Sequence, residues 1–383
     1  MTIAAVLFWT CGLVLAYTYL GYPLLAWARA ALRSRPPRAG GIEPSVTVLL
    51  AAHNEADRID GRLENLLALD YPRDRLEIVL GSDGSTDSTA EQARAWEPHG
   101  VSVVAFESRR GKPAVLNDLV PKARGEIVVL GDARQRFDRD AVRALVAPFA
   151  DPRVGAVSGE LVLTRNGDTN GVGDGVGFYW RYEKFLRRQE SRADATPGAT
   201  GAIYAIRRDL FEPIPPDTIL DDVLIPLRIT RRGYRVLLEP RARAWDRVAA
   251  TGREEFTRKV RTMAGKFQLF AREPWLLSPR RNRVWLATVS RIVLRLVAPA
   301  LMVLALGANL LLAGEPFYTV TLALQALFYT AALGGFMLRH HRRRVPLLSL
   351  PYVVCLMNWA IVVGLVRYLA GRQRVTWDKA TAS

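Results

Sequence analysis

The stretches Ser45–Glu55 and Glu77–Thr89 constrain the fold of this chain most, because each is a short apolar run that stops abruptly on polar side chains. Asn54 and Glu55 follow the first run, and Asp83 ends the second. In an open α/β sheet, ligands bind in the crevice where the parallel strands end. We therefore expect a site for a nucleotide, a sugar or a metal ion at this edge. The structural alternative is a strand–turn–helix connection in which Asp83 and its neighbours only cap the next helix.

Short apolar runs alternate with amphipathic stretches between Ser45 and about Trp245. The expected strands are VTVLLAA, EIVLGS, VSVVAF, EIVVLGD and VGAVSGELVL. The expected helices cover residues 58–69, 88–96, 113–122 and 139–150. This alternation predicts an α/β fold with a mostly parallel sheet that helices cover on both faces. No GxGxxG follows the first strand, which disfavours an ordinary dinucleotide-binding fold.

The amino-terminal stretch Ile3–Ala28 carries no charged side chain, and a group of arginines begins at Arg29. A helix needs roughly 20 apolar residues to cross a bilayer. A signal peptide has basic residues before a shorter apolar core, whereas here the basic residues come after it. The pattern predicts an uncleaved transmembrane anchor whose carboxyl end lies in the cytoplasm.

Three further apolar stretches lie at residues 292–312, 317–338 and 346–370. The basic run 339–344 is a strong cytoplasmic marker. Four spans would leave the tail outside, yet the tail is basic, which favours the inside. Either the last stretch is a re-entrant hairpin, or one stretch lies along the membrane surface. Residues 283–296, with Arg291 and Arg295, are a candidate for such an interfacial helix.

The formal net charge of +16 indicates a polyanionic neighbour, such as nucleic acid, an anionic membrane surface or phosphorylated ligands. Many arginines flank the apolar stretches, and no nucleic-acid module is recognisable. We therefore expect membrane lipids, and no nucleic acid, among the partners. Cys11 and Cys355 lie in apolar stretches and predict neither a disulfide nor a metal cluster.

Composition divides the chain into five parts. Pro36, Pro37, Gly40 and Gly41 mark a linker after the first apolar stretch. We expect an anchor at residues 1–28, a basic linker at 29–44, a cytoplasmic α/β domain at 45–275, interfacial and transmembrane helices at 276–371, and a basic tail at 372–383.

Two further strand ends carry charged side chains. Gly111 and Lys112 follow the third expected strand, where the lysine can meet a phosphate. A solvated basic loop is the alternative. Asp132 ends the fourth strand, where a carboxylate can hold a hard divalent cation between two phosphates. The alternative is an ordinary turn aspartate.

Asp221 and Asp222 stand just before a helical pattern. Acids favour a helix amino terminus, so capping is one interpretation. A general base is the other, because the four histidines form no Ser/His/Asp or Cys/His set. Arg258 to Arg261 lie on an amphipathic helix, where they contact either lipid headgroups or diphosphate oxygens.

The order and spacing of these residues resemble the membrane-bound family 2 glycosyltransferases of the processive type. Relatives in this class are the cellulose, chitin, hyaluronan and poly-N-acetylglucosamine synthases. The resemblance covers about residues 45–275, and the flanking apolar segments agree with it. It implies a GT-A fold, a Rossmann-like domain that binds a nucleotide sugar, usually a UDP-sugar, with Mg²⁺ or Mn²⁺.

The resemblance also implies roles for single residues on the donor side. Asn54, Glu55 and Asp83 would contact the nucleoside, and Lys112 would lie near the diphosphate. Asp132 matches the first acid of the metal-binding Asp-x-Asp motif. The stretch from Arg258 to Thr262 matches a Gln-x-x-Arg-Trp motif in which Arg261 keeps the arginine.

On the acceptor side, Asp222 matches the catalytic base of the Thr-Glu-Asp motif, with Asp221 beside it. The loop with Gly198, Thr200 and Gly201 resembles the acceptor loop. Two positions depart from the family pattern. Arg134 stands where the second metal-binding acid belongs, so either Asp132 binds the metal with phosphates and water, or Arg134 supplies part of the charge. Thr262 replaces the tryptophan that stacks on a polymer acceptor, which makes transfer better supported than processive synthesis.

We therefore expect an inverting glycosyltransferase in the inner (plasma) membrane, with its catalytic domain in the cytoplasm. It would move a sugar from a nucleotide sugar to a lipid-linked or growing polysaccharide acceptor, with an export partner or a second copy of the chain. One alternative is a single-sugar transferase that acts on a polyprenyl phosphate or a lipid-linked oligosaccharide. The other is a non-catalytic membrane component of a polysaccharide export complex.

Overall fold

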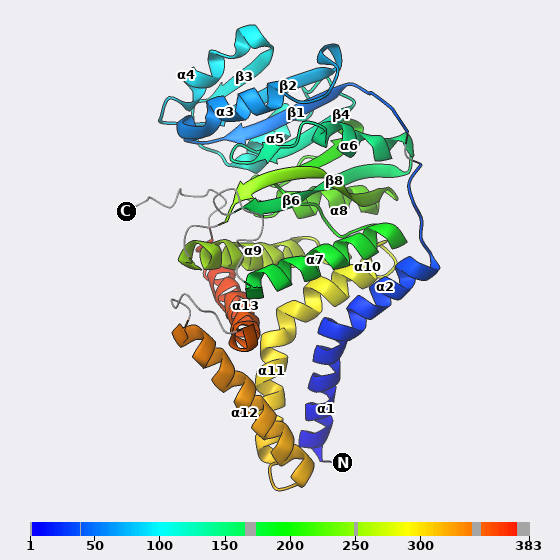
Figure 1. The fold of residues 1–383 in the computed structure, drawn as a ribbon, viewed down its shortest axis with the longest axis vertical. Helices are drawn as coiled ribbons and strands as arrows, with labels where there is room; N and C mark the ends of the chain where they lie inside the picture. The colour runs from blue at the N-terminus through cyan, green and yellow to red at the C-terminus, as the bar shows by residue number, and fades with distance from the viewer. Residues whose placement is uncertain (1, 39, 165–173, 249–251, 339–345, 374–383) are drawn as a thin grey trace.

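The computed structural model describes residues 2–38, 40–164, 174–248, 252–338 and 346–373. An α/β domain lies at one end of the molecule, and a group of apolar helices lies at the other (Figure 1). The basic run 339–344 and the tail beyond residue 373 lie outside the described residues.

The α/β domain is built on an eight-stranded sheet of order β3-β2-β1-β4-β7-β6-β8-β5. Its strands are β1 (Val46–Ala52), β2 (Leu76–Asp83), β3 (Val101–Phe106), β4 (Ile127–Asp132), β5 (Arg136–Phe137), β6 (Val154–Thr164), β7 (Ile203–Arg207) and β8 (Arg235–Arg247). β1 to β4 are parallel, and β6 is parallel to β8. β7 runs antiparallel between β4 and β6, and β5 runs antiparallel to β8. The five expected strands and the α/β fold class are confirmed, in a sheet that is mixed.

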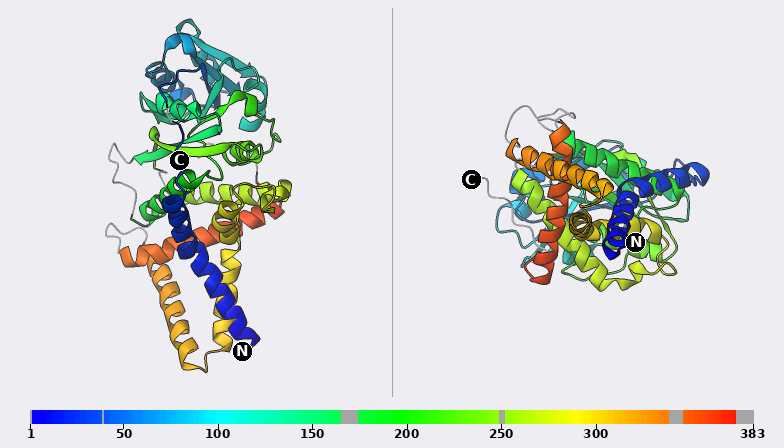
Figure 2. Two further views of the ribbon diagram at one scale, coloured as in Figure 1. Left: turned by 90° about the vertical axis from the view of Figure 1, so that its right-hand side faces the viewer. Right: turned by 90° about the horizontal axis from the view of Figure 1, so that it is seen from below.

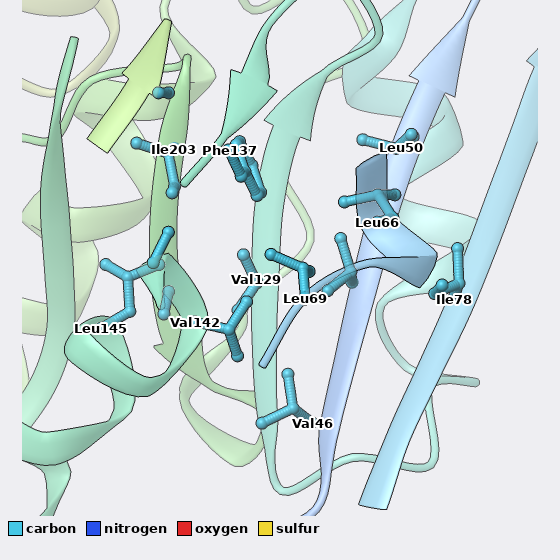
Figure 3. Packing of buried hydrophobic residues seen from close by; sticks show 14 of the residues in the cluster. Val46, Leu50, Leu66, Leu69, Ile78, Val129, Phe137, Val142, Leu145 and Ile203 are labelled. Atoms are coloured by element: carbon cyan, nitrogen blue, oxygen red, sulfur yellow. The ribbon is translucent and has the colours of Figure 1, made fainter. Parts of the chain in front are cut away.

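Helices cover both faces of the sheet, as predicted. One face carries α3 (Ala56–Leu67), α4 (Thr89–Arg94) and α6 (Ala141–Val146), and the other carries α5 (Lys112–Leu119) and α8 (Asp221–Arg231). Successive side chains of a strand point to opposite faces. Val48 and Leu50 of β1 therefore belong to the first core and Leu49 to the second. Figure 3 shows the first core, where Leu66 and Leu145 approach the strands from their helices.

Four helical stretches among the described residues are long and apolar enough to cross a membrane: Ile3–Leu32, Trp285–Leu311, Pro316–Met337 and Leu348–Leu369. They comprise α1 (Ile3–Ala16), α2 (Tyr22–Leu32), α10 (Trp285–Thr288), α11 (Leu294–Leu311), α12 (Pro316–Met337) and α13 (Pro346–Leu369). The first stretch continues beyond the predicted anchor of residues 1–28. The side chains of Leu304, Val320 and Leu324 are among the apolar groups that stay exposed on these helices. Exposed apolar side chains on helices of this length are suited to contact with lipid tails or with another apolar surface.

The apolar helices differ in direction. α1, α11 and α12 extend away from the sheet, whereas α13 runs across the long axis of the molecule (Figure 2). α13 lies against α9 (Gly252–Arg272), which together with α7 (Asp174–Ala193) separates the sheet from the apolar helices (Figure 1). The last stretch is one continuous helix, which excludes a re-entrant hairpin there. The explanation that remains is a stretch that lies along the membrane surface, and α13 has the direction that such a helix requires.

The arginines of residues 283–296 turn toward the domain. The Arg291 guanidinium donates to Glu190 at 2.7 Å and to Glu183 at 2.9 Å, and Arg295 also pairs with Glu183. Both acids belong to α7. The expected interfacial helix is a short α10 that passes through a π-helical turn (Val289–Val293) into α11. Its arginines therefore bind α7 and not lipid headgroups, because buried charges require paired partners.

A glycine permits the close contact between α13 and α9. A Cβ atom on Gly364 would lie 2.7 Å from Met263 Cβ and 3.0 Å from the Ala264 nitrogen. We predict that Gly364→Leu destabilises the protein by about 1–3 kcal/mol, because a larger side chain forces the two helices apart. The thermal unfolding midpoint in detergent measures this loss.

Gly307→Leu is the matched control, since a Cβ atom at Gly307 on α11 has no heavy atom within 4 Å. This variant should keep the wild-type midpoint. An equal loss in both variants would show that the α9–α13 contact is not the cause.

Candidate active site

The carboxyl ends of β1, β2 and β4 meet at one edge of the sheet. Ala51 is paired with Asp132, and Ala52 is paired with Ser82. The parallel register therefore brings the polar residues that follow each strand to the same edge of the sheet, which is the place where open α/β sheets have their binding crevice.

Asn54 and Glu55 join the loop after β1 to the loop after β2. Asn54 has a φ of 55°, a left-handed conformation that asparagine tolerates better than most residues. Its Oδ1 accepts a hydrogen bond from the Thr86 N–H at 2.8 Å. The Glu55 N–H donates to Thr89 Oγ1 at 2.8 Å, and its carboxylate pairs with Arg58 at 3.1 Å. Both residues hold the two loops together, and their contact with a nucleoside stays a prediction.

Asp83 fixes the loop that leads into α5. Its side chain is buried, and its two carboxylate oxygens accept hydrogen bonds from the Arg110 N–H at 2.8 Å and the Gly111 N–H at 2.7 Å. Gly111 has a φ of 91°, which favours glycine. The Asp83 carboxylate thus sets the position at which Lys112 begins α5. The contact of Asp83 with a nucleoside stays a prediction, whereas its contacts with the loop are observed.

Lys112 is the cationic centre of the crevice. Its Nζ lies 2.8 Å from Asp132 Oδ1 and 3.4 Å from Asp221 Oδ2, and all three side chains are largely buried. Burial lowers the pKa of Lys112, but the charges of Asp132 and Asp221 outweigh it and raise the pKa overall. Burial likewise raises the pKa of Asp132, and Lys112 and then Arg134 outweigh it and lower that pKa. The pair is therefore ionised at neutral pH.

Asp222 and the loop 198–201 form one unit. Asp221 and Asp222 begin α8, where the positive end of the helix dipole favours acids. The Gly201 N–H donates to Asp222 Oδ2 at 2.8 Å, and the Ala199 N–H donates to the Asp222 carbonyl at 2.9 Å. Thr200 contributes its N–H to Ser158 Oγ at 3.1 Å, which anchors the loop to β6. A Cβ atom on Gly201 would lie 3.1 Å from the Asp222 carboxylate, so the loop passes very close to it.

Asp222 is the titratable group of the site. Burial and then the negative charge of Asp221 raise its pKa to about 6, while Lys112 and Arg187 act in the opposite direction. A carboxyl group that is only just ionised at neutral pH is suited to accept a proton during a reaction.

Arg261 reaches the same cluster from α9. Burial lowers its pKa, and the negative charges of Asp221, Asp222 and Asp132 oppose that effect. The predicted residues Lys112, Asp132, Asp221, Asp222 and Arg261 therefore share one electrostatic environment. Gly198 begins the loop 198–201 with a φ of 125°, and a Cβ atom there would lie 3.4 Å from the Val223 α-carbon of α8.

Three residues of the site were not found from the sequence. Arg187 of α7 acts on Asp222, and Tyr204 of β7 is fully buried with its pKa raised by burial and then by Asp221, Asp222 and Asp132. Asp246 of β8 lies 3.0 Å from the Arg134 guanidinium. None of them stands at the end of a predicted strand, and β7 and β8 were not among the expected strands. The buried tyrosine within an apolar run was the single available signal.

The residues around Asp132 do not fit a divalent cation. Mg²⁺ and Mn²⁺ prefer several oxygen ligands, and among the described residues no group of three or more acidic, histidine or cysteine side chains is placed to hold a metal ion. Asp132 instead faces Lys112 at 2.8 Å and Arg134 at 4.0 Å. The Mg²⁺ or Mn²⁺ expected from the sequence stays a prediction, and we derive no chemical step through it.

Residues 47–214 match the family described as Glycosyl transferase family 2, and the fold is GT-A-like. The poly-beta-1,6-N-acetyl-D-glucosamine synthase of Staphylococcus aureus (strain MSSA476) is 29% identical over 233 residues, which are 60% of this chain and 56% of the relative. The enzyme of the same name from Staphylococcus epidermidis is 27% identical over 235 residues. The match therefore spans little more than half the length of these curated relatives.

A solved structure resembles nearly the whole chain. It is the mannosyltransferase PcManGT from Pyrobaculum calidifontis in complex with GDP-Man and Mn²⁺. The TM-score is 0.71 at 26% identity, and the superposition covers 96% of this chain and 99% of PcManGT. The resemblance to membrane-bound family 2 glycosyltransferases that the sequence indicated is confirmed.

The Asp83 carboxylate allows a test of how the crevice is held. We predict that Asp83→Asn destabilises the protein by about 1–3 kcal/mol, because an amide NH₂ would face a buried backbone N–H in place of one oxygen. Thermal unfolding in detergent measures the change. Asp74→Asn is the control, since the Asp74 side chain is 82% exposed. A wild-type midpoint for Asp83→Asn would refute the role of Asp83 in fixing the loop.

Proposed function

We propose that this protein is an inverting glycosyltransferase that transfers a sugar from a nucleotide sugar to an acceptor at the membrane. The observation that carries the proposal is the Asp222 carboxyl group, which is buried, has a pKa raised to about 6 and is hydrogen-bonded to the loop 198–201. It stands beside the cations Lys112 and Arg261 within a family 2 domain. A base next to cations that can receive a diphosphate is what such a transfer requires.

In the proposed reaction, an acceptor hydroxyl attacks the anomeric carbon of the donor. A new bond forms between the acceptor oxygen and that carbon, and the bond from the carbon to the diphosphate oxygen breaks. The hydroxyl proton moves to Asp222. A hydroxyl is a far weaker acid than a carboxylic acid, so the proton moves as the new bond forms and the attacking oxygen becomes acidic. Lys112 and Arg261 stabilise the negative charge on the departing nucleoside diphosphate.

The donor and the acceptor are assigned by class. The staphylococcal relatives are named as synthases of a poly-N-acetylglucosamine, and PcManGT holds GDP-Man. The GDP-Man of PcManGT supports a nucleotide-sugar donor, and we keep the UDP-sugar that the sequence predicted. Asn54, Glu55 and Asp83 would form the nucleoside end of its site. The loop with Gly198, Thr200 and Gly201, with Asp221 beside it, would receive a lipid-linked or polysaccharide acceptor.

The helix directions support a particular membrane topology. We propose that α1, α11 and α12 cross the membrane and that α13 lies along its cytoplasmic surface. This arrangement places the α/β domain and the basic tail on the same, cytoplasmic side, in agreement with the positive-inside rule. It resolves the conflict that four spans created, because α13 no longer crosses. The membrane would be the inner (plasma) membrane, where a cytoplasmic donor and a lipid-anchored acceptor meet.

Single-sugar transfer to a polyprenyl phosphate or a lipid-linked oligosaccharide is the second candidate. It is favoured by the likeness of nearly the whole chain to a mannosyltransferase structure and by the small number of helices that extend from the domain. An export partner or a second copy of the chain would be needed to complete a polymer channel. A ladder of products supports synthesis of a polymer, whereas one addition product supports single transfer.

The Asp222→Asn variant tests whether Asp222 is the catalytic base, and it also tests the alternative that the protein is a non-catalytic membrane component. We predict that turnover falls by roughly 10²–10⁴-fold, because the amide cannot accept the proton. Donor binding should change little, since the shape of the side chain is kept. Steady-state transfer assays and donor titration measure the two effects. Asp209→Asn, at an exposed position, is the control and should keep wild-type turnover. Near-normal turnover in Asp222→Asn would remove Asp222 from the mechanism.

The pH dependence of kcat/KM follows from the raised pKa of Asp222. The residue must be ionised to accept a proton, and its pKa of about 6 makes the ionised fraction fall below that pH. We predict that kcat/KM is about half of its plateau at pH 6, falls by about tenfold per pH unit well below that pH, and levels off above about pH 7. A profile that is flat from pH 5 to pH 7 would contradict this assignment.

A further inference from the structure

Arg134 occupies the position at which the family motif carries its second acid, and the structure shows what this arginine contacts. Its Nε lies 3.0 Å from Asp246 Oδ2, and its NH2 nitrogen lies 4.0 Å from Asp132 Oδ2. Gln135 donates a hydrogen bond from Nε2 to the same Asp246 oxygen at 3.0 Å. The guanidinium is thus held between β8 and the end of β4, beside the strand-end carboxylate. Its place is built by surrounding side chains and is not that of a solvated surface arginine.

Lys112 stands on the other side of Asp132. An ammonium group has three N–H donors. The Lys112 ammonium donates one of them to Asp132 at 2.8 Å and lies 3.4 Å from the Asp221 carboxylate, so it keeps donor capacity for a ligand at this edge of the sheet. This ammonium is held by the carboxylate that ends β4 and by a carboxylate that begins α8, and it places a positive charge directly beside Asp132.

A divalent cation at Asp132 would have to displace this lysine or approach close to it. Displacement would leave a buried ammonium next to a dication, and two like charges in a buried site repel strongly. Arg134 adds a further positive charge on the same carboxylate, and it lowers the pKa of Asp132 together with Lys112 and Arg261. The electrostatic surroundings of Asp132 therefore disfavour the cation that the family motif implies.

We propose that the donor diphosphate binds directly to Lys112, Arg134 and Arg261, and that no divalent cation bridges it to Asp132. This inference rests on the proposed function. A planar guanidinium donates two parallel hydrogen bonds to phosphate oxygens, and Lys112 supplies a fixed point charge. Asp132 orients Lys112, and Asp246 orients Arg134. The departing diphosphate then receives its stabilising charge from side chains that are in place before the donor binds.

The test is calorimetric titration of the full chain in detergent with UDP and with GDP. Each nucleotide is titrated once in EDTA and once in MgCl₂ or MnCl₂. We expect the Kd of the nucleotide that binds to differ by less than about threefold between EDTA and metal, since this is under 1 kcal/mol. Binding that is lost in EDTA and restored by Mg²⁺ or Mn²⁺ overturns the inference and leaves the proposed function intact. The absence of binding under every condition overturns both.

Variants at Arg134 give an independent readout. Arg134→Ala should raise the Kd for the nucleotide in EDTA by roughly 10–100-fold, because it removes a charge-assisted contact to phosphate. Arg134→Lys should recover part of the binding. Arg139→Ala, at an exposed position on the same segment, is the matched control and should bind as the wild type does. Wild-type affinity in Arg134→Ala contradicts the inference, and thermal unfolding confirms that each variant is folded.

Arg134→Asp reverses the chemistry of the site. It restores an Asp-x-Asp sequence and places a third carboxylate near Asp132 and Asp246. We expect this variant to bind Mn²⁺ alone at least about tenfold more tightly than the wild type, because carboxylates are the ligands that this ion prefers. Titration with MnCl₂ in the absence of nucleotide measures it. A wild-type chain that binds Mn²⁺ as tightly as the variant does would overturn the inference.

Discussion

The ammonium of Lys112, held between Asp132 and Asp221, is the interaction on which the arrangement of the crevice depends. It connects the start of α5 with the end of β4 and the start of α8, three elements that are far apart in the sequence. A buried charge is stable only with close partners of opposite sign, so the three side chains fix one another. Asp83 adds the next link, because its carboxylate holds the two backbone N–H groups that precede Lys112. These contacts fix the position of the proposed nucleoside end at Asp83 relative to the proposed transfer end at Asp221 and Asp222.

The membrane helices act on the crevice through α9. This helix carries Arg261 on the side of the carboxylates and contacts α13 around Gly364 on the other side. Below the crevice, Arg291 joins α7 to the segment that enters α11 through two buried carboxylates. In the proposed arrangement, transfer takes place directly above the apolar helices, where a lipid-linked acceptor would meet Asp222. Figure 1 shows the sheet, α9 and α13 in this order.

The sequence was sufficient to place residues that end a strand. The residues after β1, β2 and β4 could be placed at one edge because parallel strands end together, whereas the role of Asp222 as a base came from the family resemblance and stays a prediction. β7 and β8 were not predicted, since β7 pairs with β4 and β6, and β8 pairs with β6 and β5, and each of these partners lies more than forty residues away in the sequence. The contact of Arg134 with Asp246 depends on that pairing. The structural role of Asp83 could not be predicted either, because a side chain that accepts hydrogen bonds from backbone N–H groups leaves no pattern in the sequence.

The release of nucleoside diphosphate is the most direct test of the central claim that the crevice is a sugar-transfer site. Membranes that contain the chain would be incubated with a panel of UDP- and GDP-sugars, and compared with membranes that lack it. The account predicts that one donor is cleaved faster in the presence of the chain and that its sugar appears in a lipid-linked or polymeric product. Equal release from every donor in both membranes, with a full lipid extract supplied as acceptor, would contradict it.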